Sequence, residues 1–213
     1  GTVNDNSATI TVSVGAQQLT ATNNGNGTWT LANDAINPAL AQGTYNVAVT
    51  ATDLAGNAGA DATNNELRID TAAPVVTVST LVTNDNRPAL NGTVNDTTAS
   101  IRVDVGGQTN LVATNNGNGT WTLVDNTISP ALASSVYNVV VRATDAAANV
   151  GTDATTNELT IDTTAPTVTV STLTTSDNTP ALSGTVSETG AVISVTVSGQ
   201  TNAATNNGNG TWT

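Results

Sequence analysis

The side chains of this chain that could do chemistry are almost all carboxylates and amides. The chain holds sixteen Asp and Glu residues against four Arg, has no Lys, His or Cys, and carries a net charge of −12. Without His, Cys or Lys the usual pairs of nucleophile and base cannot be assembled, and no thiolate or imidazole can bind a transition metal. The chemistry that remains is the binding of a hard cation such as calcium (Ca²⁺) by oxygen ligands, and we expect no enzyme.

A long internal repeat organises the chain. The segment ATNNGNGTWTL at 21–31 returns unchanged at 113–123, and its first ten residues return at 204–213. The tryptophans of these three segments are 92 and 91 residues apart. A period of this length gives each repeat enough chain to bury a core of its own, so we expect separate domains and not the stacked layers of a short-repeat solenoid.

The period divides the chain into three predicted domains. Repeat 1 covers 1–70 and lacks the first strand of the pattern, repeat 2 covers 71–162 and is complete, and repeat 3 covers 163–213 and lacks its C-terminal half. The chain contains no Met. We therefore expect these residues to be part of a longer array.

Short runs in which apolar and polar residues alternate dominate each repeat, and no helical pattern occurs. In repeat 2 the predicted strands are 75–81, 89–94, 101–105, 111–114, 119–124, 137–143 and 158–162. Trp121 and Leu123 fall on the inward side of the fifth strand, so we interpret the tryptophans as core residues. This pattern predicts an all-β fold in which each repeat is a sandwich of two sheets.

Tyr137 stands at the beginning of the predicted sixth strand, where immunoglobulin-like folds place a conserved tyrosine corner. Two features depart from antibody domains, because there is no cysteine pair and Trp121 lies in the fifth strand instead of the third. The fold class that we predict is a tandem array of immunoglobulin-like, seven-stranded antiparallel β-sandwiches, arranged as beads on a string.

Four further motifs carry a resemblance to a known family. They are TDLAGNAG at 52–59, TDAAANVG at 144–151, IDTTAP at 161–166 and TSDNTPALSGTV at 175–186. In their order and period these motifs resemble the bacterial immunoglobulin-like repeats of giant secreted adhesins, of the biofilm-associated and repeats-in-toxin types exported by type I secretion. The resemblance implies an extracellular or cell-surface extender that presents a distal adhesive region for attachment or biofilm formation. It also implies calcium at the junctions between repeats.

The order of the strands gives the calcium sites a geometric basis. In antiparallel strands joined in sequence, successive turns alternate between the two ends of the sandwich. At the junction of repeats 1 and 2 the linker residue Asp70 should therefore meet Asp96 of the second turn, together with Asp145 and Asn149 of the sixth. Carboxylates gathered in this way repel one another and favour a cation with oxygen ligands.

The same argument applies at the next junction. There the linker residue Asp162 should approach Asp85 from the first turn of repeat 2 and Glu188 from the second turn of repeat 3. Asp53 is the counterpart of Asp145 in repeat 1 and is the last candidate ligand. An alternative reading is that each of these residues only hydrogen-bonds the backbone of its own turn, as Asp and Asn commonly do.

The acidic balance argues against nucleic acid and anionic membranes as partners, and no segment is apolar enough to insert into a membrane. The expected partners are the neighbouring repeats of the same chain. Two alternatives stay open: the chain is a segment of an extracellular filament built from several copies, or it is a glycan-binding module, which would need an exposed aromatic side chain. An incomplete sandwich such as repeat 1 would also expose a groove that a strand of another chain could fill.

Overall fold

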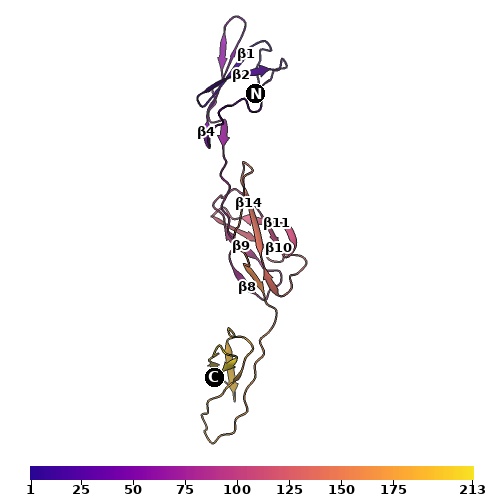
Figure 1. Cartoon of the computed structure of the whole chain (residues 1–213), viewed down its shortest axis with the longest axis vertical. Coiled ribbons are helices and arrows are strands. Elements are labelled where there is room, and N and C mark those ends of the chain that lie inside the picture. Colours follow the sequence, from indigo (N-terminus) through magenta and orange to yellow (C-terminus); the bar gives the residue numbers. More distant parts are fainter.

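The computed structural model describes all residues, 1–213, and contains β-strands and no helix. Three bodies follow one another along a line (Figure 1). They correspond to the three repeats: the N-terminal one is drawn in indigo and purple, the central one in magenta and orange, and the C-terminal one in yellow. The predicted all-β, tandem fold is confirmed.

The strands of each repeat have the following bounds. Repeat 1 contains β1 (Thr9–Val14), β2 (Gln17–Asn23), β3 (Trp29–Thr30), β4 (Gly43–Tyr45), β5 (Val47–Thr52), β6 (Ala58–Ala60) and β7 (Leu67–Ile69). Repeat 2 contains β8 (Leu81–Thr83), β9 (Leu90–Thr93), β10 (Ser100–Val105), β11 (Gln108–Asn115), β12 (Thr120–Leu123), β13 (Ser135–Tyr137), β14 (Val139–Thr144), β15 (Val150–Thr152) and β16 (Leu159–Ile161). Repeat 3 contains β17 (Gly184–Thr185), β18 (Ile193–Val197), β19 (Gln200–Ala204) and β20 (Thr211–Trp212).

Repeat 2 shows the complete arrangement. Its strands pair in the order β15-β14-β10-β11-β12-β9, and a smaller group pairs in the order β13-β16-β8. Strand β11 pairs with β10 through Ala113 and then with β12 from Thr114 onward, so it passes from one face of the sandwich to the other. The side chains between the two faces form the core.

The first predicted strand, 75–81, is split in the structure. Val76 bridges to Val94 on one face, and the chain then crosses to form β8, which runs parallel to β16. The backbone N–H of Leu81 donates to the Glu158 carbonyl (2.7 Å). The entering strand thus changes faces and ends in a parallel pair beside the last strand of the repeat, while the other paired strands of repeat 2 are antiparallel.

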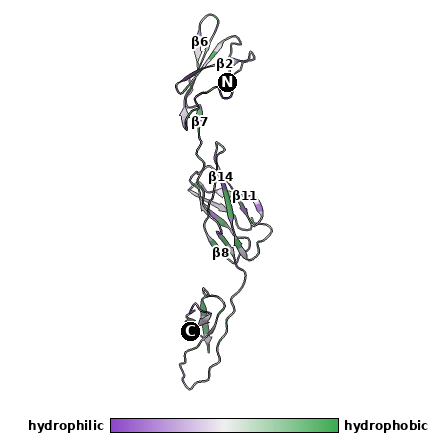
Figure 2. Ribbon diagram, viewed as in Figure 1, coloured by the Kyte–Doolittle hydropathy of each residue, from purple (hydrophilic) through white to green (hydrophobic).

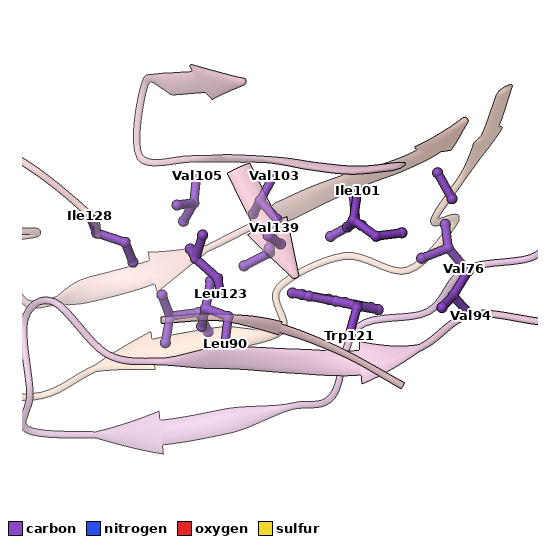
Figure 3. Close-up of a cluster of buried hydrophobic side chains, with 14 of the residues drawn as sticks. Val76, Leu90, Val94, Ile101, Val103, Val105, Trp121, Leu123, Ile128 and Val139 are labelled. Carbon is purple, nitrogen blue, oxygen red and sulfur yellow. The ribbon is translucent and has the colours of Figure 1, made fainter. Parts of the chain in front are cut away.

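Apolar side chains of repeat 2 fill the space between the two faces (Figure 3). Seventeen buried residues form one cluster, with Trp121, Leu123, Val103 and Val139 fully enclosed. Hydrophobic residues lie along β14 in the middle of this bead (Figure 2). The interpretation of Trp121 as a core residue is confirmed, since none of its surface is exposed.

The Trp121 indole also fixes the first strand of its own repeat. Its Nε1 donates to the Thr77 carbonyl (2.8 Å), directly above Gly92. A Cβ at Gly92 would overlap that carbonyl and the indole nitrogen, so only glycine fits at this position. Repeat 3 builds the same contact, because Nε1 of Trp212 donates to the Thr169 carbonyl (2.9 Å).

The tyrosine corner predicted at Tyr137 is present. The Tyr137 hydroxyl donates to the Ala133 carbonyl (3.0 Å), and in repeat 1 the Tyr45 hydroxyl donates to the Ala41 carbonyl (2.9 Å). In both repeats the hydroxyl thus ties the start of the sixth strand to the loop four residues earlier.

One inserted residue accounts for the difference between spacings of 92 and 91. In the β10–β11 hairpin, Val103 pairs with Leu111 but Val105 pairs with Gln108, so β11 holds one residue more than its partner. The extra residue is Asn110, which adopts a φ of 58°. The equivalent hairpins of repeats 1 and 3 pair without a shift. Every spacing of 92 therefore spans this β-bulge.

A charged pair that only repeat 2 possesses holds the bulge. The N–H of Asn110 donates to Asp104 Oδ1 (2.7 Å), and Arg142 Nη2 lies 2.8 Å from Asp104 Oδ2. The counterparts of the pair in repeat 1 are Ser13 and Thr50, which carry no charge. Burial acts to raise the pKa of Asp104, but the Asn110 N–H and the Arg142 guanidinium outweigh it, and the pKa is lowered.

Candidate functional site

At the joint between repeats 1 and 2, the linker packs against the N-terminal end of repeat 2. The amide Nδ2 of Asn149, in the turn between β14 and β15, donates to the main-chain carbonyl of Asp70 (3.0 Å). These residues are 79 positions apart in the sequence. The linker is therefore fastened to the sixth turn of repeat 2 by a direct hydrogen bond.

Asp145 shapes the turn that presents Asn149. Its carboxylate accepts the N–H of Ala147 (2.9 Å), the N–H of Asn149 (2.8 Å) and the Asn149 side-chain amide (2.9 Å). The last of these bonds is the largest cause of the lowered pKa of Asp145. An aspartate that hydrogen-bonds the backbone two and four residues later stabilises a tight turn, which is why the sequence Asp-Ala-Ala-Ala-Asn folds this way.

Asp96 lies at the same end of repeat 2. Its Oδ1 accepts both the N–H and the hydroxyl of Thr98 (2.7 Å each), and these bonds lower the pKa of Asp96. The Arg68 charge lowers it further, and the charge of Asp96 in turn acts to raise the pKa of Asp145. Asp96, Asp145 and Arg68 thus share one electrostatic environment at the joint.

Arg68 supplies a positive charge beside the acidic residues of the first joint. Its Nη2 lies 2.7 Å from Asp70 Oδ2, while Asp70 Oδ1 accepts the N–H of Ala72 (3.2 Å). The Asp70 side chain is 16% exposed, whereas that of Arg68 is 72% exposed. The linker carboxylate that was expected to bind calcium is therefore already paired with a cation from its own repeat.

The acidic residues at the joints are spread over separate turns. No group of three or more acidic side chains lies close enough to hold a metal ion. At the first joint the carboxylates of Asp70, Asp96 and Asp145 each accept hydrogen bonds within their own turns. Calcium at this joint stays a prediction, and the direct protein contacts are what the structure provides.

At the second joint the structure brings two of the three predicted residues near each other. The N–H of Asp162 donates to the Thr83 carbonyl (2.9 Å), and Asp85 follows two residues after Thr83. The carboxylates again form hydrogen bonds within their own turns. Asp162 accepts the backbone N–H of Thr164, and Asp85 accepts that of Arg87.

Glu188 forms no hydrogen bond with Asp162. Its carbonyl instead accepts the side-chain amide of Asn206 (2.8 Å) inside repeat 3. The second turn of repeat 3 is thus tied to the Asn-Gly hairpin, as the carbonyl of Asp96 is tied to Asn115 in repeat 2 (2.8 Å).

Comparison with known proteins places the chain in a family. Residues 1–71 and 77–163 match the family described as the bacterial Ig-like domain. The chain belongs to this family. The prediction of bacterial immunoglobulin-like repeats is thereby confirmed, and the two matched segments overlap repeats 1 and 2.

Several solved structures are similar to this bacterial Ig-like chain. A tetra-tandem repeat in the extending region of a large adhesion protein is 26% identical, with a TM-score of 0.40 over 99% of this chain and 58% of that one. A structure from a 1.5-MDa bacterial ice-binding adhesin is 21% identical, with a TM-score of 0.39 over 96% of this chain and 73% of that one. Fibronectin(III)-like modules of Clostridium thermocellum CbhA are 12% identical, with a TM-score of 0.38 over 76% and 81%.

This chain spans somewhat more than half of the adhesion-protein structure that it matches. A comparison with curated proteins found no match. The assignment to the bacterial Ig-like domain therefore rests on the sequence match. The structure also contains no helix long and apolar enough to cross a membrane.

Two residues at the bead ends of these Ig-like domains, Asp5 and Arg68, were not predicted from the sequence. Asp5 is the repeat-1 counterpart of Asp96, and its charge lies near that of Asp53. Asp53 forms the same turn as Asp145, with its carboxylate accepting from Asn57. The spacing of 91 residues between Asp5 and Asp96 would have identified the pair. Thr160 stands at the position of Arg68 in repeat 2, so the repeat pattern could not reveal Arg68.

Proposed function

We propose that the chain is an extender segment of a bacterial cell-surface or secreted adhesin, in which Ig-like beads hold a distal adhesive region away from the cell for attachment or biofilm formation. The observation that carries this proposal is the joint, where the Asn149 side chain binds the Asp70 carbonyl and fastens one bead to the next. A linker held in this way keeps successive beads in line (Figure 1). Each bead then adds roughly 35–40 Å of reach, the length of a strand of about ten residues with its turns.

The surface chemistry supports a structural, extracellular role. Most of the chemically capable side chains are carboxylates engaged in turns at bead ends, and the chain has no His, Cys or Lys with which to build a nucleophilic site. The net charge of −12 keeps extended copies apart in solution. The motifs shared with adhesin repeats support the same role.

The proposal also includes calcium bound at the joints between beads. Asp96 and Asp145 face the same joint, and extracellular calcium modules bind their ion at about 10⁻⁴–10⁻³ M. An ion bound with tenfold excess calcium would add about 1.4 kcal/mol to the joint, on top of the direct hydrogen bond. Because Arg68 neutralises Asp70, we expect this site to be weak.

Glycan binding draws no support from Trp121 or Trp212. Trp121 is fully buried and Trp212 is 1% exposed, so neither presents a ring face on which a sugar could stack.

The extender proposal is tested by changing the number of beads while the adhesive region is kept. An adhesin from which complete copies of repeat 2 are removed should lose attachment in proportion to the reach lost, and replacement by an unrelated rigid spacer of equal length should restore it. The proposal would be wrong if the isolated 213-residue chain bound the target surface by itself, or if the spacer failed to restore attachment.

A further inference from the structure

Each repeat carries the triplet Asn-Gly-Thr at the tip of the hairpin that precedes its tryptophan, at 26–28, 118–120 and 209–211. The sequence Asn-x-Thr is the acceptor motif for sugars linked to an asparagine side chain. The same motif occurs twice more in repeat 2, at 91–93 and 95–97. Geometry therefore decides which of the five asparagines is suited to accept a sugar.

In repeat 2 the side chain of Asn118 is exposed and its amide oxygen is bonded to Thr120. Oδ1 of Asn118 accepts both the N–H of Thr120 (3.2 Å) and its hydroxyl (2.7 Å). Nδ2 of Asn118 donates no hydrogen bond to the protein. Gly119, between the two residues, has a φ of 89° and no side chain that could obstruct the amide. The nitrogen that a sugar would join is therefore free and accessible.

The two other asparagines of this hairpin use their amide groups inside the fold. Nδ2 of Asn115 donates to the main-chain carbonyl of Asp96 (2.8 Å). Nδ2 of Asn116 donates to the hydroxyl oxygen of Thr120 (2.9 Å), so the proton of that hydroxyl is left to donate to Asn118. Of the three asparagines, Asn118 is thus the one whose amide nitrogen the hairpin does not use.

The hydrogen bond from the Thr120 hydroxyl also suits Asn118 for attack on an activated sugar. An amide nitrogen is a weak nucleophile, because its lone pair is delocalised onto the oxygen. When Nδ2 bonds a sugar and loses a proton, negative charge develops on Oδ1. A hydroxyl that already donates to this oxygen stabilises that charge without further rearrangement.

The other two repeats build the same tip. In repeat 1, Oδ1 of Asn26 accepts the N–H (3.2 Å) and the hydroxyl (2.6 Å) of Thr28. In repeat 3, Oδ1 of Asn209 accepts the same two groups of Thr211, again at 3.2 Å and 2.6 Å. Both asparagine side chains are exposed, and neither Nδ2 donates a hydrogen bond to the protein. Three equivalent acceptor sites therefore recur along the chain.

The two remaining motifs lack this arrangement. Asn91 lies inside strand β9, and the hydroxyl of Thr93 is bonded to that of Thr77 (2.6 Å). Oδ1 of Asn95 accepts the N–H of Val75 (2.7 Å), at the entrance of the first strand. Neither asparagine accepts a hydrogen bond from the threonine of its own motif. These two positions are therefore natural controls within the same chain.

We propose that Asn118 and its counterparts Asn26 and Asn209 accept N-linked sugars from a glycosyltransferase of the cell that makes this chain. The donor is a sugar whose anomeric carbon is activated by a phosphate group, carried on a nucleotide or on a lipid. Nδ2 forms a bond to the anomeric carbon, the bond from that carbon to the phosphate oxygen breaks, and the phosphate leaves with the electron pair. Nδ2 gives up one proton to a base of the transferase. The sugars then recur once per bead.

Mass spectrometry of the protein recovered from the cells that make it tests the proposal. Peptide maps should show the added mass of a sugar at Asn118, Asn26 and Asn209, and none at Asn91 or Asn95. Absence of sugar from all three hairpin tips would overturn the proposal, and so would equal modification of all five asparagines. Conversion of Asn118 to aspartate with no sugar would also overturn it, since that change is simple deamidation of an Asn-Gly sequence.

Two substitutions of Thr120 separate the hydroxyl from the shape of the side chain. Thr120→Val removes the hydroxyl and should abolish the sugar at Asn118, while Asn26 of the same molecule stays modified. Thr120→Ser keeps the hydroxyl and should keep the sugar. Both variants should melt like the unchanged chain, because Thr120 is exposed. Undiminished sugar at Asn118 in Thr120→Val would contradict the role given to the hydroxyl and with it the proposal.

The purified 213-residue chain distinguishes the two donors. One sample is incubated with UDP-glucose and the soluble fraction of the cells, and the other with their membrane fraction, which supplies lipid-linked sugars. Transfer to Asn118 in the first sample supports the proposal with a nucleotide-linked donor, and transfer in the second supports it with a lipid-linked donor. Transfer in neither sample would count against the proposal.

Discussion

Asn149 Nδ2 lies 3.0 Å from the main-chain oxygen of Asp70, and this hydrogen bond crosses from one bead to the next. Asn149 is held for this contact by Asp145, which accepts both its backbone N–H and its side-chain amide. The same side chain thus completes a turn inside repeat 2 and anchors the linker that enters it.

Asn149→Ala should loosen the joint without unfolding either bead. The variant removes one part-buried hydrogen bond, which contributes about 1 kcal/mol to the fastened arrangement. Small-angle scattering should show a shorter mean end-to-end distance and a broader distribution of shapes. Asn57→Ala is the matched control, because Asn57 makes the same turn contacts with Asp53 in repeat 1 and its side chain donates only to Asp53. Equal effects of the two substitutions would contradict the role of Asn149 at the joint.

Calcium should bind the first joint only weakly, and removal of Arg68 should strengthen binding. In Arg68→Ala the Asp70 carboxylate loses its partner and joins Asp96 and Asp145 in an uncompensated acidic group. Calorimetric titration should give a dissociation constant near 10⁻³ M for the unchanged chain and one lower by about tenfold for the variant.

A chelator should make the joint more flexible in scattering experiments while the cores stay folded. Asp145→Asn in the Arg68→Ala background should reverse the gain in affinity, since it removes one anionic ligand. If neither chain bound calcium at millimolar concentrations, the calcium part of the proposed function would be abandoned.

Acid should destabilise repeat 2 through Asp104. The pKa of Asp104 is lowered in the folded chain, because its hydrogen bonds from Asn110 and Arg142 outweigh burial. The stabilising contribution is therefore complete above the unfolded pKa of about 3.9 and is lost as the pH falls through the lower, folded pKa. Melting temperatures measured from neutral pH downward should stay level and then fall below about pH 4.

Asp104→Asn isolates this contribution from the general change in charge. Asparagine keeps an oxygen that can accept the Asn110 N–H but never carries the charge that pairs with Arg142. The variant should be less stable at neutral pH, and the difference from the unchanged chain should shrink on acidification. Two melting curves that remain parallel at every pH would show that the pair makes no ionic contribution.

Gly92→Ala should unfold repeat 2 or displace its first strand. The new methyl group would overlap the Thr77 carbonyl and the Trp121 indole nitrogen, so the hydrogen bond between them could not form. We expect a loss of about 3 kcal/mol or more in the free energy of unfolding, as for other substitutions that overpack a core and break a buried bond. Gly59→Ala, where a Cβ would meet nothing within 4 Å, should change stability little. Denaturant unfolding followed by Trp fluorescence would measure both.

The sequence alone predicted the array, its Ig-like beads and the inward tryptophans, because alternation and an exact internal repeat report on packing that each bead performs by itself. It did not predict the crossing of the first strand to β16, since residues 75–81 read as a single strand of alternating apolar and polar residues. Nor did it predict the bulge at Asn110. One extra residue leaves the hydrophobic pattern on both sides intact, and only pairing reveals the shift.

The candidate site, too, was predicted only in part from the sequence. The alternation of turns between bead ends correctly placed Asn149 opposite the linker, because topology alone decides which turns face a junction. What each carboxylate does there depends on local partners that a pattern of acidic residues does not show. Arg68 lies two residues before Asp70 and turns a predicted metal ligand into half of an ion pair.

The parallel pair of β8 and β16 has a mechanical meaning for an array of this kind. Strand β8 follows from the linker that enters repeat 2, and β16 leads into the linker that leaves it. Tension along the array therefore pulls these neighbouring strands in opposite directions. The bonds between them, from Leu81 N–H to Glu158 and from Asp162 N–H to Thr83, lie across that pull and are loaded in shear. These hydrogen bonds must break together before the bead can unfold under tension. Each bead therefore resists stretching where its first strand pairs with its last.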